Sequence, residues 1–498
     1  TDIDDFHYYR SVPERREEWD TLTAEFAARA DWTFSPYGDG QRRGDEPLVV
    51  SEFGVWGLPH PDQVTIGGGE PWWMETGGTW GDGVAYPHGV QDRFAQLGLS
   101  RVFGSFDGFV AAVQGYQFAN LKYEIESMRG WPSIQGYVIT EFTDVHWESN
   151  GLLDMNRNPR SFHHSFAGIN TDVVIVPRID RYSAFMGDLF DFGLSVAAGG
   201  RALPRTQLRW RMEGQSGVLD VPACAALGVA DAGRLSLPMP ADGANRMLTF
   251  AFELVAGDAV LARNEVSVAL HRRPDLSRAP TVGTRDAAVA EHLSALGLRV
   301  VDAESADVTV ARGLDADDIA RMQGGAIYLL IADGSAGSRI RTDTPRREQP
   351  YIPIVDDIPG LPLTQEGQMP NMVLHARQGT IWRGDWIAGF SWIRREGPLA
   401  ALPGGPLVDL SFDRVIPRHV LTGFRTWEYG GPVHAGVVVG WCHKPAALIA
   451  ERRIGRGALV ATTFRLFSEP AGQDPVALTL TDALLALAAG QRVERAAF

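Results

Sequence analysis

The sequence of 498 residues has little cysteine, fewer basic than acidic residues and no long apolar run. No apolar stretch approaches the ~20 residues of a membrane-spanning helix, so we expect no membrane partner. Lys and Arg number 46 against 61 Asp and Glu, a net charge of −15, which argues against nucleic acid as a partner. Two distant cysteines, Cys224 and Cys442, predict no disulfide framework. A cytoplasmic location is our expectation, with a periplasmic or secreted one left open.

The most informative stretch is residues 47–57, where apolar and β-branched residues lead into Glu52 and are followed by Gly54 and Gly57. A buried parallel strand that ends at a polar site has this pattern. In a (β/α)₈ barrel the catalytic groups lie at the C-terminal ends of the strands, which is the position of Glu52. For this segment alone, the alternative is that Glu52 has a structural role, as a capping group or as a member of an ion pair.

Two further strands and two helices surround this stretch in the sequence. Residues 1–9 resemble the end of a strand that carries His7, Tyr8 and Tyr9 toward a site. There they would orient Glu52 or bind a substrate hydroxyl. The alternative is that the tyrosines fill the core and that His7 is a hydrogen-bonded structural residue. Periodic apolar residues predict helices over 14–30 and 107–129. The strand 134–141 ends in Glu141. Three βα units in series predict a parallel sheet with right-handed crossovers.

A long loop over residues 56–90 is rich in aromatic side chains, and loops of this length in compact domains are usually functional or disordered. It contains Trp56, Trp72, Trp73, Trp80, Tyr86 and His88. Flat aromatic rings suit the C–H faces of sugars, so we expect a carbohydrate-binding loop; the alternative is a loop that folds on its own aromatic cluster. Beyond the strand, Asp144, His146, Trp147 and Asn150 form a polar lip of candidate substrate-binding residues.

The rest of the chain predicts two more domains. Short alternating runs over 179–273 predict an immunoglobulin-like β-sandwich, and residues 272–280 predict a linker. From 274 to 498, alternating strands and helices predict a three-layer α/β domain, with an inserted segment at about 334–425. The fold class is therefore multidomain, α/β plus all-β.

Three motifs within residues 1–178 resemble glycoside hydrolase family 2, the β-galactosidase, β-glucuronidase and β-mannosidase group. Ser51-Glu52-Phe53-Gly54 resembles the nucleophile strand of that family, and Asp4–Tyr9 resembles the tip of its sixth strand. Residues 136–148 and 150–160 resemble its eighth strand and the Asp-x-x-Arg-x-Pro-Arg ending that follows. The resemblance implies the last three strands of a (β/α)₈ barrel. The final domain looks like a flavodoxin- or amidotransferase-like module without a catalytic elbow, since Cys442 lies in Gly-Trp-Cys-His-Lys-Pro.

The family implies a retaining, exo-acting β-glycosidase in which Glu52 attacks the anomeric carbon. Retaining enzymes hold a second carboxyl about 5–5.5 Å away as acid and base, and the family's strands one to five, which carry it, have no counterpart here. Because three strands cannot close a barrel, we expect a processed, split or truncated product whose partner is an N-terminal glycosidase portion. We expect no cofactor and no metal; His163-His164 lack a third ligand at metal spacing. Oligomer contacts through the C-terminal domain are a further expectation.

Other interpretations stay open at this point. Glu141 would bind sugar or pair with an arginine, with an acid/base role as a lesser alternative. A non-catalytic carbohydrate-binding or structural subunit of a glycosidase assembly is the alternative function. An active amidotransferase needs a Cys/His/Glu constellation that the C-terminal domain does not show.

Overall fold

The computed structural model describes residues 2–35, 37, 40–75, 87–146, 148–334, 351–353, 372–378, 382 and 389–492. The N-terminal part is a three-stranded parallel sheet in the order β1 (Asp4–His7), β2 (Leu48–Phe53) and β3 (Ile134–Ile139). Helix α1 (Arg16–Ala27) follows β1, and the long helix α5 (Phe106–Arg129) precedes β3. The predicted parallel pairing of the strands that lead to Glu52 and Glu141 is confirmed.

The two faces of this sheet differ. On one face Leu48, Val50 and Phe53 are fully buried against α1 and α5. On the other, Asp5, His7 and Val138 are exposed. Parallel sheets are normally covered on both faces, so the described part of the chain leaves one face of this sheet without its usual layer.

A β-sandwich follows, as predicted. One sheet joins β4 (Val174–Arg178), β6 (Leu189–Ala197) and β9 (Val229–Pro238). The other has the order β5 (Ser183–Phe185), β11 (Ala259–His271), β10 (Arg246–Ala256), β7 (Thr206–Met212) and β8 (Gln215–Val221). Phe192 and Leu194 of the first sheet pack against Phe250 and Leu254 of the second. Alternation of buried and exposed residues along the strands placed these elements from sequence, whereas the immunoglobulin-like topology stays a prediction.

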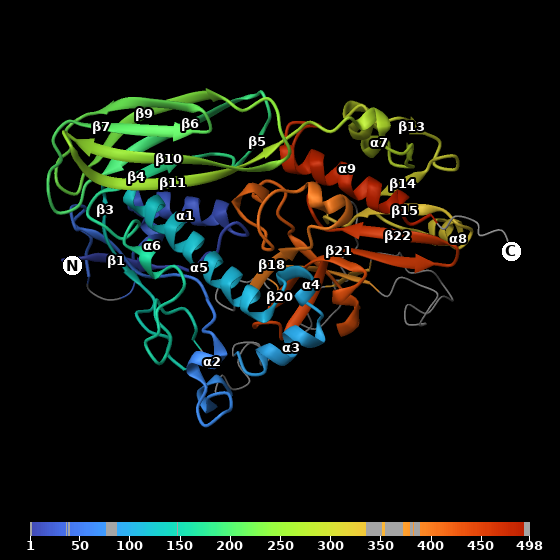
Figure 1. The fold of residues 1–498 in the computed structure, drawn as a ribbon, viewed down its shortest axis with the longest axis horizontal. Coiled ribbons are helices and arrows are strands. Elements are labelled where there is room, and N and C mark those ends of the chain that lie inside the picture. The colour runs from blue at the N-terminus through green and yellow to red at the C-terminus, as the bar shows by residue number, and fades with distance from the viewer. Residues whose placement is uncertain are drawn as a thin grey trace.

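The C-terminal part contains a large mixed sheet, drawn in yellow to red in Figure 1. Its parallel strands are β12 (Val282–Gly283), β13 (Val300–Val301), β14 (Val308–Ala311), β15 (Ile327–Ile331) and β22 (Gly457–Thr462). Its antiparallel strands are β16 (Tyr351–Pro353), β17 (Val373–Ala376), β18 (Gly389–Ile393), β19 (His419–Thr422), β20 (Val433–Val439) and β21 (Lys444–Ile454). Strands β21 and β22 form an antiparallel hairpin that turns between Ile454 and Gly457.

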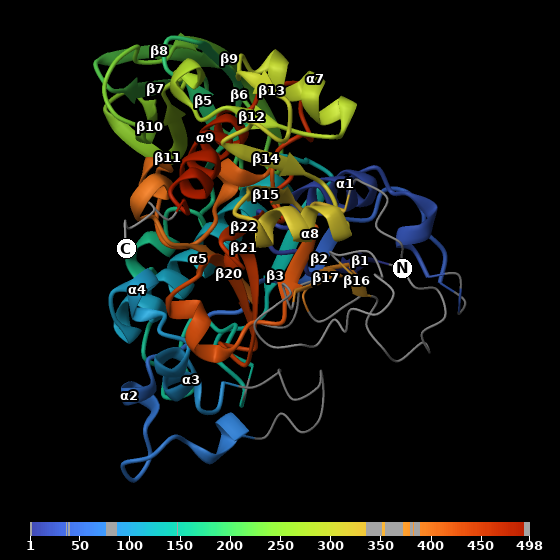
Figure 2. The same ribbon diagram turned by 90° about the vertical axis from the view of Figure 1, so that its right-hand side faces the viewer.

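Helices cover both faces of this large sheet, but they come from different parts of the chain. Helices α7 (Ala287–Ala295) and α9 (Pro475–Ala489) pack on one face, and α9 lies between that sheet and the sandwich in Figures 1 and 2. On the other face α8 (Ala316–Gln323) is joined by α3 (Val90–Gln96), α4 (Ser100–Phe103) and the first half of α5. The third layer predicted within 274–498 is therefore supplied in part by residues 90–116, which is a correction that sequence order could not reveal.

Short helices α2 (Pro61–Val64) and α6 (His163–Phe166) complete the set of α-helices among the described residues. None of the helices in this part of the chain has both the length and the apolar character needed to span a bilayer.

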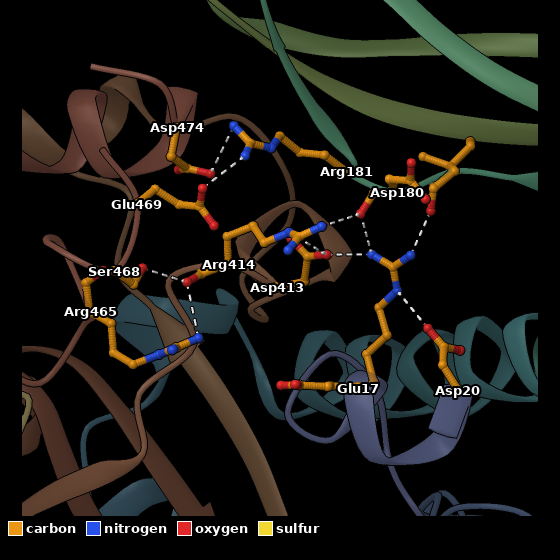
Figure 3. A network of polar contacts seen from close by, with 12 residues as sticks. Glu17, Asp20, Asp180, Arg181, Asp413, Arg414, Arg465, Ser468, Glu469 and Asp474 are labelled. Carbon is orange, nitrogen blue, oxygen red and sulfur yellow. Dashed lines mark hydrogen bonds and ion pairs between the residues drawn. The ribbon is translucent and has the colours of Figure 1, made fainter. Parts of the chain in front are cut away.

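The three parts meet at the buried guanidinium of Arg16. Its Nη1 donates to the carbonyl oxygen of Asp180 at 2.9 Å and to the carboxylate of Asp413, while its Nε donates to the hydroxyl of Tyr123 at 2.9 Å. Figure 3 shows the surrounding network, to which Asp20, Asp180 and Asp413 belong. The side chains of Arg16 and Asp413 are only 13% and 6% exposed, so both charges are largely withdrawn from water.

Replacing Arg16 by methionine should therefore lower the free energy of unfolding by about 3 kcal/mol, because the buried Asp413 carboxylate loses its closest cation and keeps only Arg414 at 4.0 Å. Urea unfolding followed by tryptophan fluorescence measures this. Arg178→Met is the matched control, because its ion pair with Asp231 is exposed on both sides and should contribute at most about 1 kcal/mol. Equal losses in the two variants would contradict the role given to Arg16.

A second buried charge lies in the core between α5 and the sheet. Glu124 is fully buried, and neither carboxylate oxygen has a hydrogen-bond partner among the described residues. Burial raises the pKa of Glu124 from 4.5 to about 8. The folded state then binds the proton of Glu124 more tightly than the unfolded state. The contribution of this proton to the free energy of unfolding is therefore complete below pH 4.5 and is lost as the pH rises toward 8.

Glu124→Gln removes this titration. Its stability relative to the wild type should rise between pH 5 and pH 8, with an upper limit of about 5 kcal/mol from 1.36 kcal/mol per pKa unit. Urea midpoints at the two pH values measure the change. Glu265→Gln, on the exposed face of β11, should leave the pH dependence unaltered. A Glu124→Gln variant with the wild-type slope would show that Glu124 is ionised inside the fold.

Candidate functional site

Glu52 lies near the C-terminal end of β2, the central strand of the parallel sheet, and its side chain is exposed. The hydroxyl of Tyr9 donates to Glu52 Oε2 at 2.8 Å. Directly after β2, the chain passes close to the end of β3, where Thr140 N donates to the carbonyl oxygen of Phe53 at 3.0 Å. Gly54 has a φ of +141°, and a Cβ there would meet Thr140 O at 2.8 Å, so only glycine fits between the two strand ends.

Glu141 lies at the same edge of the sheet, just beyond β3. Its carboxyl group is close enough to Glu148 for the negative charge of Glu148 to disfavour ionisation of Glu141. Burial, followed by the charges of Glu148, Asp144 and Glu52, raises the pKa of Glu141 to about 7. In the described residues, none of Glu52, Glu141 and Glu148 forms an ion pair with Lys, Arg or His. A carboxyl group with a pKa raised this far can keep its proton near neutral pH.

The lip that follows Glu141 is held by a buried ion pair. Arg160 Nη2 donates to Asp144 Oδ1 at 2.5 Å, and both side chains are at most 1% exposed. Gly151 N donates to the same oxygen at 2.9 Å, and a Cβ on Gly151 would meet Asp144 N at 2.3 Å. The arginine that ends the Asp-x-x-Arg-x-Pro-Arg motif therefore fixes the lip from inside. Asp144 is therefore occupied by a buried ion pair, and the substrate contact expected of it stays a prediction.

Trp72 and His146 meet at the surface of the lip. Trp72 is 65% exposed, and its ring centroid lies 6.0 Å from that of His146. They come from the aromatic loop and from the lip, so the structure brings together two candidate segments that are far apart in the sequence. Trp80, Tyr86 and Trp147 lie outside the described residues, and their roles stay predictions.

Four other candidates are buried. Tyr8 is 4% exposed and its hydroxyl is hydrogen-bonded to that of Thr23, which is the core role left open from sequence. Trp73 packs with Val64 and Met74. Asn150 is 6% exposed, and Trp56, 7% exposed, packs against Trp441. These four side chains are thus largely withdrawn from solvent, and the substrate contact expected of them stays a prediction. His7 is exposed on the open face of the sheet, where its role stays a prediction.

Glu148 is the functional candidate that sequence reasoning missed. It lay at the end of the recognised motif, but no periodic or spacing signal distinguished it from the other residues of the lip. Only the turn between Val145 and Glu148, which are bridged to each other, returns its carboxyl group to Glu141.

The described part of the C-terminal domain shows no activated thiol. Cys442 is 2% exposed and lies between β20 and β21, and burial raises the pKa of its thiol to about 12. A thiolate is the reactive form of cysteine, so this environment does not favour a nucleophile. Among the described residues no cluster of three His, Cys, Asp or Glu is arranged to hold a metal ion.

No family model and no curated protein matches the chain. Among solved structures, it is similar to a β-glucuronidase from glycoside hydrolase family 2, at 12% identity and a TM-score of 0.16, over 52% of this chain and 26% of that one. A suggested β-galactosidase from Bacteroides fragilis aligns at 12% identity and a TM-score of 0.19, over 54% of this chain and 32% of that one. The sporulation control protein Spo0M from Bacillus subtilis aligns at 8% identity and a TM-score of 0.16, over 20% of this chain and 49% of that one. The chain thus spans half or less of each of these three proteins, and TM-scores this low support no conclusion about function.

Proposed function

We propose that this chain carries the nucleophile half of the active site of a retaining, exo-acting β-glycoside hydrolase, with Glu52 as the nucleophile. The observation that carries the proposal is the exposed Glu52 carboxylate near the end of the central parallel strand, with the Tyr9 hydroxyl at 2.8 Å and Glu141 beside it. A carboxylate in this position can attack an anomeric carbon and form a glycosyl-enzyme intermediate. The resemblance of residues 1–178 to glycoside hydrolase family 2 supports the same assignment.

The other groups have separate roles in this proposal. The Tyr9 hydroxyl holds one oxygen of Glu52, which leaves the other free to attack. Glu141, which keeps its proton near neutral pH because its pKa is about 7, donates a hydrogen bond to a sugar hydroxyl. Trp72 and His146 supply a flat surface at the rim for the sugar or the leaving group.

The general acid comes, in this proposal, from a further polypeptide. Departure of an alkoxide needs a proton donor, and general acid catalysis contributes about 10²–10⁴-fold. The face of the sheet that bears the exposed His7 and Val138 is where the rest of a barrel would pack, because a parallel sheet of three strands needs a covering layer and paired edges. A partner that supplies strands one to five would place the acid opposite Glu52.

A carbohydrate-binding subunit without catalysis is the second candidate. It is favoured by the exposed Trp72 beside His146, which would bind a sugar face whether or not a partner completes the site. Turnover of a panel of aryl β-glycosides by the chain with its partner separates the two, since the second candidate predicts binding alone. The same panel would identify the sugar.

Glu52→Gln should abolish nearly all turnover in the active assembly while leaving the melting temperature unchanged, because an amide is not a nucleophile. A mechanism-based 2-fluoro glycoside should attach to Glu52 in the wild-type protein, as peptide mass spectrometry would show. Glu265→Gln is the control and should keep full activity. Attachment of the label to Glu141 would overturn the assignment.

Trp72→Ala should reduce kcat/KM by about ten-fold or more, equivalent to about 1.4 kcal/mol of lost transition-state binding, because an exposed ring that stacks on a sugar is removed. Steady-state kinetics on the best aryl glycoside measures the effect. Trp32, also exposed but hydrogen-bonded to Glu25, gives the control Trp32→Ala. Unchanged kinetics in Trp72→Ala would make the aromatic loop purely structural.

A further inference from the structure

The turn between β20 and β21 has an unusual backbone. Gly440, Trp441 and Cys442 have φ angles of +62°, +48° and +73°. Non-glycine residues in this left-handed region cost of order 1–3 kcal/mol each, and they persist where the surrounding structure holds them. Such outliers cluster at functional sites, so the contacts of this turn are informative.

The turn directs Trp441 into the N-terminal part of the molecule. Trp441 is completely buried, and its Nε1 donates to the carbonyl oxygen of Gly57 at 2.8 Å. Its ring lies 5.5 Å from that of Trp56, at an interplanar angle of 90°. Arg93 Nη2 donates to the carbonyl oxygens of Gly440 and Trp441 at 3.4 and 3.2 Å, which holds the turn in place.

Gly57 belongs to the segment that leaves the nucleophile strand. Its N–H donates to the carbonyl oxygen of Ser149 at 2.7 Å, so the segment is fixed to the lip on one side and to Trp441 on the other. A Cβ on Gly57 would meet Gln117 Oε1 at 2.2 Å, which leaves little space for the segment to shift. Only residues 53–56 separate this clamp from Glu52.

We propose that Trp441 is a positioning residue for Glu52, through which the C-terminal domain fixes the segment 54–57 and hence the direction of the nucleophile. This inference rests on the proposed function. In this proposal Trp441 does not contact the substrate. The C-terminal domain orients the segment that bears Glu52 and supplies no reacting group. A displacement of the reacting groups by about 1 Å can cost 10²-fold in rate, so one buried hydrogen bond in this clamp can control kcat.

Trp441→Phe removes the Nε1 donor and keeps an aromatic ring. In the active assembly it should lower kcat and the rate of Glu52 labelling by a 2-fluoro glycoside about ten-fold or more, with KM within about two-fold. Trp392→Phe is the matched control, because Trp392 is equally buried in the same core and its Nε1 has no partner among the described residues. It should change stability by a similar amount and leave kcat unchanged. Equal kcat in the two variants would overturn the proposal.

Hydrogen–deuterium exchange of residues 53–58 gives a readout that does not depend on turnover. Trp441→Phe should increase the exchange rate of these amides about ten-fold, as loss of about 1.4 kcal/mol predicts, whereas Trp392→Phe should not. Arg93→Met, which frees the turn while keeping Trp441, should act in the same direction and serves if Trp441→Phe does not fold. If the assembly shows no turnover but the exchange rates differ in this way, the glycosidase function is refuted and the contact of Trp441 with segment 54–57 still stands. If exchange is unchanged in both Trp441→Phe and Arg93→Met, the positioning role of Trp441 is refuted.

Discussion

The structure depends on the burial of helix α5 against two different sheets. Its C-terminal half covers the N-terminal parallel sheet through Leu121, Ile125 and Met128, and its N-terminal half covers the large C-terminal sheet through Phe109 and Val113. Burial of apolar area is the dominant favourable term in folding, so neither sheet can separate from α5 without exposing a core. The catalytic candidate and the C-terminal domain are consequently parts of one packed body (Figure 1).

Polar contacts give this packing its specific geometry. Arg16 joins α1 to the sandwich and to the C-terminal domain through Asp180 and Asp413. Trp441 joins the C-terminal domain to the segment after Glu52. Apolar burial is tolerant of small shifts, whereas buried hydrogen bonds and ion pairs are costly to leave unmade. These contacts therefore fix the relative positions of surfaces that the hydrophobic effect only brings together.

The carboxyl groups at the edge of the N-terminal parallel sheet are in different environments. Glu52 is exposed and accepts a hydrogen bond from Tyr9, whereas Glu141 is partly buried near Glu148, and burial raises the pKa of Glu141 to about 7. Asp144 forms a buried ion pair with Arg160. A sheet whose second face is open in the described residues, with two such carboxyl groups at its edge, is consistent with a site that a further polypeptide completes.

The sequence by itself determined the elements and their order. Apolar periodicity located the three parallel strands, the sandwich strands and most helices, because burial of one face imposes a period on the residues. It also located Glu52 at a strand end. Only tertiary structure decided which candidate side chains reach the surface. Tyr8, Trp56 and Asp144 are buried, whereas Trp72 is exposed beside His146 and the half-buried Tyr9 contacts Glu52. Burial depends on partners far away in sequence, such as Trp441 for Trp56, and a local pattern carries no information about them. For the same reason, the layer that residues 90–116 supply to the C-terminal sheet was decided by the fold alone.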